Sequence, residues 1–249
     1  MTEGDLLALG YDRAGAQRIL SLLSENELLE RYIYKSNRQN CVPVTRVNEE
    51  YPLPVRKRLG LDAPGCLWAK GNTGVLKSQM VALVGSRELR EENRRFAETV
   101  GREVARQGYT LVSGNARGAD KTAQAACLEA GGKVISIVAD ELEKYPLTEN
   151  VLYLSEDSFD LPFSALRALS RNRVIHALGY ITIVAQCNGE NGGTWDGTLK
   201  NIQNNWSPVF CFDDGSATAQ KLEQMGATLI TPEDLTDLCA LQPDVKFIL

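Results

Sequence analysis

The chain has 249 residues, of which 43% are hydrophobic and 24% are charged, proportions typical of an ordinary globular protein with a sizeable core. Its 27 Lys and Arg residues and 32 Asp and Glu residues give a formal net charge of −5. That charge argues against a protein that coats duplex DNA through a uniformly basic surface, but it leaves room for a local basic pocket.

The cysteine and histidine contents argue against a metal site. The six cysteines form no Cys-x-x-Cys pair and the chain has one histidine, so we expect no metal ion. Cys127 and Cys211 fall in apolar helix and strand patterns, as reduced core thiols do in cytoplasmic proteins. The N-terminus lacks a signal-peptide pattern, and no apolar stretch approaches the ~20 residues of a membrane span. We therefore expect a cytoplasmic protein with no membrane partner.

Residues 1–72 differ in pattern from the rest of the chain. Leucine and isoleucine residues recur at helical spacing over 6–29, with a break at Gly10, which predicts two or three short helices. Turns containing proline and glycine over 51–71 then indicate an extended connector. We interpret 1–72 as a helical N-terminal region and linker, and 73–249 as the main domain with a short C-terminal tail.

From residue 80 onward, short apolar strands alternate with helices. The expected strands cover 80–84, 110–112, 133–138, 152–154, 180–185, 208–212 and 228–230. The expected helices cover 94–107, 119–130, 164–178, 194–205 and 217–225. Apolar strands separated by helices predict an α/β fold in which a parallel sheet carries helices on both faces.

Three loops that follow strands are candidates for a ligand site. Right-handed crossovers place all strand-to-helix loops at one edge of a parallel sheet, where ligands bind. The loops are Gly85–Arg87, Ser113–Asp120 and Gln186–Thr198. The dinucleotide fingerprint and the P-loop motif are both missing after Val84, so the sequence gives little support to a standard NAD-binding or ATPase function.

The segment 110–124 passes from an apolar strand through a glycine loop into a helix. Gly114 and Gly118 flank the turn, where a side chain would obstruct the backbone or a ligand. Free amides at the start of the helix would favour a phosphate. The alternative is a tight turn that binds nothing, and the segment alone does not separate the two.

Basic and hydroxyl side chains lie on or near these loops. Guanidinium groups pair well with phosphate oxygens, and Ser86 and Ser113 add hydroxyl donors. Arg171 and Arg173 are two residues apart on an expected helix, so they point in different directions. At most one of them can reach a ligand, and we expect the other to pair with an acidic neighbour. The basic candidates are Arg87, Arg117, Lys121, Arg171 and Arg173.

Several spaced motifs resemble the DprA/Smf family of DNA-processing proteins. They are Tyr51-Pro52, the run 63–71, Val84 to Arg87, Ser113 to Asp120, Tyr145-Pro146, Ser155-Glu156 and Arg171-Asn172-Arg173, in the order seen in that family. The resemblance spans roughly 51–230. It implies an extended Rossmann-like core that binds single-stranded DNA and helps to load a RecA-type recombinase during natural transformation or recombination. It also implies no cofactor and no chemistry on the DNA, and many members form homodimers through the core.

The chain departs from the family pattern in three places. Ala123-Gln124 stands where the family has an alanine-histidine pair, and 190–198 replaces a serine-glycine-serine loop. We also expect the winged-helix-like module of many members to be lacking after the last expected strand. These differences indicate a divergent branch and leave its pathway open.

The motifs and the loop positions together give one candidate set of DNA- or phosphate-binding residues. The set is Gly85, Ser86, Arg87, Ser113, Gly114, Arg117, Gly118, Lys121, Arg171, Asn172 and Arg173. Tyr145, Phe163 and Trp195 are candidate stacking platforms for bases, although each also fits a packing role.

Catalysis finds little support in the sequence. His176, the only histidine, lies on an apolar helix face and is expected to be structural, and no nucleophile–histidine–acid set is evident. One alternative is a nucleotide N-glycosidase of a related Rossmann-like class, in which Glu190 or Asp196 beside the glycine-threonine loop 192–198 would supply the carboxylate. A second alternative is a nucleotide sensor that uses the same pocket without DNA.

Overall fold

The computed structural model describes residues 1–241 and contains two compact units, Met1–Val42 and Pro43–Leu249. The first unit holds three helices, as predicted: α1 (Glu3–Ala8), α2 (Arg13–Ser24) and α3 (Asn26–Arg38). Thr2 and Asp12 cap the first two through their side chains, which accept hydrogen bonds from backbone amides in the first turn. None of the described helices is both long and apolar enough to cross a membrane.

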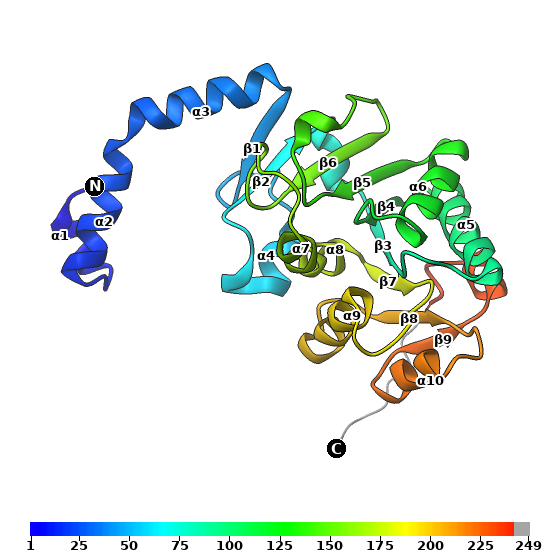
Figure 1. The fold of residues 1–249 in the computed structure, drawn as a ribbon. Coiled ribbons are helices and arrows are strands. Elements are labelled where there is room, and N and C mark those ends of the chain that lie inside the picture. The colour runs from blue at the N-terminus through cyan, green and yellow to red at the C-terminus, as the bar shows by residue number, and fades with distance from the viewer. Residues whose placement is uncertain (242–249) are drawn as a thin grey trace. The chain divides into compact units, whose positions relative to one another are not determined.

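A nine-stranded sheet organises the described part of the second unit (Figure 1). In spatial order its strands are β1 (Cys41–Thr45), β2 (Cys66–Lys70), β6 (Val151–Ser155), β5 (Lys133–Ile137), β4 (Thr110–Ser113), β3 (Met80–Val84), β7 (Ile181–Val184), β8 (Val209–Phe212) and β9 (Thr228–Ile230). From β6 to β9 every neighbouring pair is parallel, in register. The predicted α/β fold with a parallel sheet is confirmed.

Helices cover both faces of this sheet, and each face buries its own apolar cluster. Phe96 of α5 (Glu91–Arg106) and Ala123 of α6 (Ala119–Glu129) pack with Leu83 and Leu111 on one face. The opposite face buries side chains from four helices, α4 (Leu53–Leu59), α8 (Asn172–Leu178), α9 (Gly193–Asn204) and α10 (Ala217–Gln224). Strands buried on both sides need continuous apolar sequence, and runs of apolar residues therefore located them in the sequence.

The structure differs from the expected elements over 41–71, where β1 was also not expected, and over 164–178. The single helix expected over 164–178 is divided at Arg171 into α7 (Ala165–Ser170) and α8. The stretch expected to be a connector contains α4 and β2, and β2 pairs antiparallel with β6. Pro52 and Pro54 lie at the start of α4, where a proline has no hydrogen bond to break, so they begin a helix rather than interrupt one.

The boundary between the two compact units, after Val42, lies upstream of the domain boundary expected near residue 72. Whether 1–72 behaves as one functional segment stays a prediction. Residues 242–249 of the expected C-terminal tail lie outside the described residues.

Candidate nucleic-acid interface

The three candidate loops meet at the carboxyl ends of the central strands β4, β3 and β7. Ser86 joins them: its amide donates to Gln186 O at 3.0 Å, its carbonyl accepts from the Ala119 amide at 3.1 Å, and its hydroxyl accepts from the Asn188 amide at 3.1 Å. The predicted convergence of these loops is confirmed. Ser86 is buried, and its hydroxyl is engaged with the neighbouring loop.

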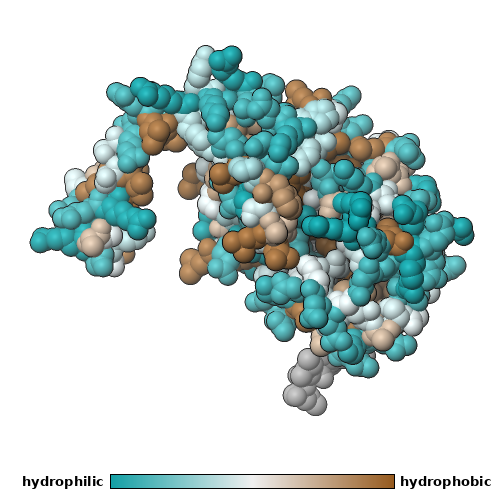
Figure 2. Space-filling view, in the orientation of Figure 1, coloured by the Kyte–Doolittle hydropathy of each residue, from teal (hydrophilic) through white to brown (hydrophobic). Residues whose placement is uncertain are grey.

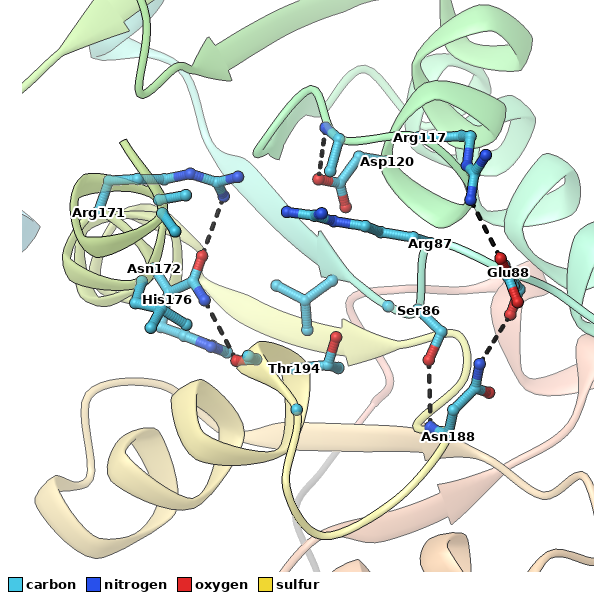
Figure 3. Close-up of a pocket in the computed structure, with 18 residues that line it drawn as sticks. Ser86, Arg87, Glu88, Arg117, Asp120, Arg171, Asn172, His176, Asn188 and Thr194 are labelled. Atoms are coloured by element: carbon cyan, nitrogen blue, oxygen red, sulfur yellow. Dashed lines mark hydrogen bonds and ion pairs between the residues drawn. The ribbon is translucent and has the colours of Figure 1, made fainter. Parts of the chain in front are cut away.

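A cavity of about 490 Å³ opens between the loops, α7 and the start of α9 (Figure 3). Its lining includes Gly85, Ser86, Arg87, Glu88, Ala116, Arg117, Asp120, Ala168, Leu169, Arg171, Asn172, His176, Asn188, Gly192, Gly193 and Thr194. A second cavity of about 300 Å³ adjoins it and shares Arg87, Ala116, Arg117, Ala168 and Arg171. We call these the main cavity and the side cavity.

Arg171 is the central cation of the site. Its side chain is 7% exposed, and its guanidinium donates to Gly114 O and Asn172 Oδ1, each at 3.0 Å. Its Nε is buried without a partner, and no carboxylate lies within 4 Å in the part of the chain that the structure describes. Burial lowers the pKa of Arg171, and the more distant Asp120 carboxylate opposes that shift. An arginine stays charged under such conditions, so Arg171 is a buried positive charge without an ion-pair partner within 4 Å.

Arg87 supplies a second cation beside it. Its side chain is exposed and reaches across the main cavity toward Arg171, and it has no hydrogen bond or ion pair within residues 1–241 (Figure 3). Asp120 is a buried acid that lines the same cavity, and burial raises its pKa against the influence of Arg171 and Arg87. Asp120 accepts a hydrogen bond from the Ala116 amide at 3.0 Å. Asp120 therefore holds the glycine loop in place.

The two loop glycines make room for neighbours. A Cβ at Gly114 would lie 1.8 Å from Arg171 Nη1, so only glycine admits the guanidinium. Gly118 has φ +85°, and a Cβ there would lie 2.4 Å from Ser86 O. The amides of Ala116 and Ala119 are also occupied, by Asp120 and by Ser86 O. The expectation of free amides at the start of α6 is wrong for these two groups, because the protein satisfies them itself.

The remaining basic candidates separate into two groups. Arg117 lines both cavities and pairs with Glu88 at 3.1 Å on the surface. Arg173 pairs with Glu156 at 2.6 Å and contacts Ser170, which confirms the ion pair predicted for one arginine of the 171–173 segment. Lys121 is exposed, and neither Lys121 nor Arg173 is among the residues lining the two cavities.

Among the three aromatic candidates, Phe163 is the one available to a ligand. It is 55% exposed and lines the side cavity with Arg87 and Arg171. Tyr145 also lines that cavity, but its ring stacks on Tyr153 with centroids 4.7 Å apart. Trp195 is buried in the core. Exposed apolar side chains gather on and beside α7 (Figure 2): Leu161, Phe163, Leu166 and Leu169.

Some polar residues in or beneath the site were not singled out for it by the sequence. Asn188 and Thr194 line the main cavity, and their only signal was a position after β7. Gln124, which replaces the family histidine, is buried and donates to Ser113 Oγ, so both lie beneath the loop as structural groups.

His176 lines the main cavity but is structural in its contacts, as predicted. Asn201 Nδ2 lies 3.2 Å from His176 Nδ1, and Asn201 Oδ1 accepts from the Ser207 amide, which fixes the amide orientation. Burial lowers the pKa of His176 to about 3, so the ring is neutral near pH 7.

Fold and site together define a class: a Rossmann-like protein with an arginine-lined cavity at the carboxyl edge of its sheet. The chain belongs to the DNA recombination-mediator protein A family, whose sequence model matches residues 43–240. This result confirms the DprA/Smf resemblance.

Individual comparisons agree with that assignment. DNA processing protein DprA of Bacillus subtilis (strain 168) is 27% identical over 217 residues, which are 81% of this chain and 72% of the relative. The crystal structure of DNA processing protein A from Streptococcus pneumoniae matches with a TM-score of 0.78 at 24% identity, over 97% of this chain and 87% of that one. A structure of DNA processing protein A from Helicobacter pylori, described for its single-stranded DNA binding mode, matches with a TM-score of 0.66 at 22% identity, over 79% and 94%.

Proposed function

We propose that this protein binds single-stranded DNA at the main and side cavities and assists the loading of a RecA-type recombinase in DNA uptake or recombination. The observation that carries the proposal is Arg171, a buried guanidinium with no carboxylate within 4 Å in the described chain and with Nε unpartnered. An uncompensated buried cation is costly in the free protein, and a phosphate would relieve that cost. Arg87 stands across the cavity to complete the contact.

The surroundings of the arginines favour a single strand over a duplex. Phe163 and Leu169 are exposed at the edges of the two cavities, where unstacked bases could lie on them. A duplex cannot place its bases there, and a chain of net charge −5 offers no broad basic surface to its two backbones. The printed description of the Helicobacter pylori relative, which names a single-stranded DNA binding mode, supports this choice.

Family membership supports further proposals about the partner, the assembly and the location. We propose a recombinase partner, a homodimer formed through the core at 73–249 and a cytoplasmic location. We also propose that the protein performs no chemistry on the DNA. The candidate contact residues are Arg87, Arg117, Arg171 and Asn172, supported by Gly85, Ser86, Ser113, Gly114 and Gly118.

A nucleotide N-glycosidase is less well supported. Glu190 pairs with Lys221, and Asp196 pairs with Lys200 at 2.9 Å. Both carboxylates are about half-exposed, and neither lines the main cavity. A carboxylate that attacks or orients water at a sugar must lie within hydrogen-bond reach of the substrate. A nucleotide sensor fits the cavity better than an enzyme does. For a sensor, the affinity would not rise from a mononucleotide to a longer strand.

A titration separates these functions. The protein is titrated with a mononucleotide, a long thymidine oligonucleotide and a duplex of equal length, at several salt concentrations. We expect the single strand to bind tightest, with affinity that rises with length and falls with salt by about 0.7 log units per contacted phosphate per log unit of salt. Affinity that does not rise between the mononucleotide and the oligonucleotide would exclude the DNA function. Steady release of free base would exclude a pure binding protein.

A further inference from the structure

The stretch 156–164, which joins β6 to α7, has no helix or strand of its own. We call its residues 161–163 the platform loop. Phe163 lines the side cavity and is 55% exposed, and Leu161 beside it is also exposed. An aromatic ring on an irregular segment stacks well on a base only where the backbone beneath it is held, because ordering a mobile segment costs conformational entropy on binding.

Arg167 of α7 holds the backbone of the platform loop. Its Nη1 donates to Leu161 O at 2.9 Å and to Pro162 O at 2.8 Å, the two carbonyls that precede Phe163. The same nitrogen lies 3.2 Å from the carbonyl oxygen of Ala139, a residue that lines the side cavity. One guanidinium therefore ties the platform loop to the wall of that cavity.

The other nitrogens of Arg167 are also engaged. Nε donates to Asp157 Oδ2 at 2.8 Å, and Nη2 donates to Ser155 Oγ at 3.0 Å. The Arg167 side chain is 12% exposed and is not among the residues lining the main or side cavity. With all three nitrogens in use inside the protein, this guanidinium is not available to a phosphate, and its contacts act on the loop.

We infer that Arg167 is a positioning residue that makes binding depend on the bases of the strand, because it holds Phe163 where a base can stack. This inference rests on the proposed function, but the contacts that carry it are separate from those of Arg171. Phosphates contribute to affinity through charge, and a base contributes by stacking on an aromatic face. Weakening the contacts of Arg167 should therefore lower the contribution of the bases and leave that of the phosphates unchanged.

The test compares two single strands of equal length, a thymidine oligonucleotide and an abasic oligonucleotide with the same number of phosphates. Fluorescence anisotropy gives the affinity of each strand at several salt concentrations. The ratio of the two affinities measures the contribution of the bases. A change that only alters the charge of the protein or its folded fraction moves both affinities together and leaves this ratio unchanged.

The variants separate the geometry of Arg167 from its charge. Arg167→Lys keeps the positive charge but has one nitrogen in place of the planar fork, so it cannot keep the contacts on both sides. Phe163→Ala removes the ring, and the double variant shows whether both changes act through one contact. Asp157→Ala removes the ion pair at Nε and is the milder variant if Arg167→Lys does not fold. Arg106→Lys is the control, since Arg106 also donates to a backbone carbonyl, Thr236 O at 2.8 Å, and lines neither cavity.

For the wild type and Arg106→Lys, we expect the thymidine strand to bind about tenfold tighter than the abasic strand, the effect of one stacked base. We expect this ratio to fall to about threefold in Arg167→Lys and in Phe163→Ala, with little further fall in the double variant, and to about sixfold in Asp157→Ala. The affinity of Arg167→Lys for the abasic strand and its salt dependence should match those of the wild type.

A folded Arg167→Lys protein that keeps the wild-type ratio would overturn the inference. If that variant does not fold, an unchanged ratio in Asp157→Ala would do the same. A double variant that loses much more than Phe163→Ala would also overturn it, because Arg167 would then act elsewhere. A wild type that binds both strands equally would end the inference and leave the proposed function intact. A wild type that binds neither strand would end the proposed function, and the inference with it.

Discussion

Two arginine-containing regions lie at the same edge of the sheet, and their surroundings differ. The main cavity holds Arg171, buried without a carboxylate within 4 Å in the described chain. A neighbouring cavity of about 410 Å³, beyond β8, holds Arg90. Arg90 forms an ion pair with Asp214, whose side chain is 3% exposed, and Asp214 also accepts from Asn93 Nδ2 at 2.8 Å. Arg90 therefore has an ion-pair partner within the described chain, and Arg171 has none.

The pKa values of the acids show the same contrast. Burial alone would raise the pKa of Asp214, but hydrogen bonds from Ser216 and Asn93 and the contact with Arg90 outweigh it and lower that pKa below its ordinary value of 3.8. Asp120, near Arg171, has its pKa raised by burial, which the arginine opposes without overcoming. A position at the ligand edge is thus not enough to mark a binding arginine. The charge balance around it is the informative feature.

Replacing Arg171 should have the largest effect on binding. Arg171→Met keeps the length of the side chain and removes its charge, and we expect single-stranded DNA affinity to fall about a hundredfold, since losing one partner of a buried charge pair has that size. Fluorescence anisotropy with a thymidine oligonucleotide measures the loss, and Arg90→Met is the control. Equal losses of affinity in the two proteins would show that the two arginines do not differ in DNA binding.

Displacing Arg171 without removing it should have a somewhat smaller effect. Gly114→Ala puts a Cβ where the guanidinium lies, so the side chain must leave its position. We expect affinity to fall roughly thirtyfold, because the charge stays near the cavity but loses its geometry. Gly65→Ala, where a Cβ meets nothing within 4 Å, is the matched control. Wild-type affinity in a folded Gly114→Ala protein would show that the position of Arg171 is unimportant.

Replacing Arg87 tests the exposed cation. Arg87→Ala should weaken single-strand binding about tenfold and flatten the log–log salt dependence by about 0.7, the value for one phosphate contact on a single strand. The measurement is a series of titrations over a range of salt concentrations. A weaker affinity with an unchanged salt slope would assign Arg87 a packing role in place of a phosphate contact.

The compensated region should affect stability but not binding. Arg90→Met leaves Asp214 without its cation, and we expect the free energy of unfolding at pH 7 to fall by about 1–2 kcal/mol, less than for a fully buried pair because Arg90 is half-exposed. Affinity for DNA should stay within about threefold of the wild type, within the scatter of surface substitutions. Urea unfolding and anisotropy measure the two quantities.

The same pair predicts a direction for pH dependence. Because the folded-state pKa of Asp214 is depressed, its contribution to stability is present above the unfolded-state pKa and is lost as the pH falls through the folded-state value, below 3.8. The difference in stability between wild type and Arg90→Met should therefore persist from pH 7 to about 5 and shrink at lower pH. A difference that grows on acidification would contradict this assignment.

Much of the fold followed from the sequence because it depends on local pattern. The central strand β3 has the expected bounds, because a strand buried on both sides must be continuously apolar. The meeting of the loops after β3, β4 and β7 followed from crossover handedness. The opposite directions of Arg171 and Arg173 followed from helix geometry, and the pair between Arg173 and Glu156 agrees with them.

The tertiary structure decided what local pattern could not. Antiparallel β2 and the helix α4 lie in a stretch that its prolines made look like a connector. The pairing of β2 with β6 joins segments more than 80 residues apart in the chain, which a local pattern does not record. Gly114 and Arg171 are 57 residues apart, so their contact depends on two distant segments meeting. Whether an arginine at this edge forms an ion pair depends likewise on which carboxylate from a distant segment lies beside it. The sequence determined which residues stand at the edge of the sheet. Long-range packing determined which of their charges was left without a partner.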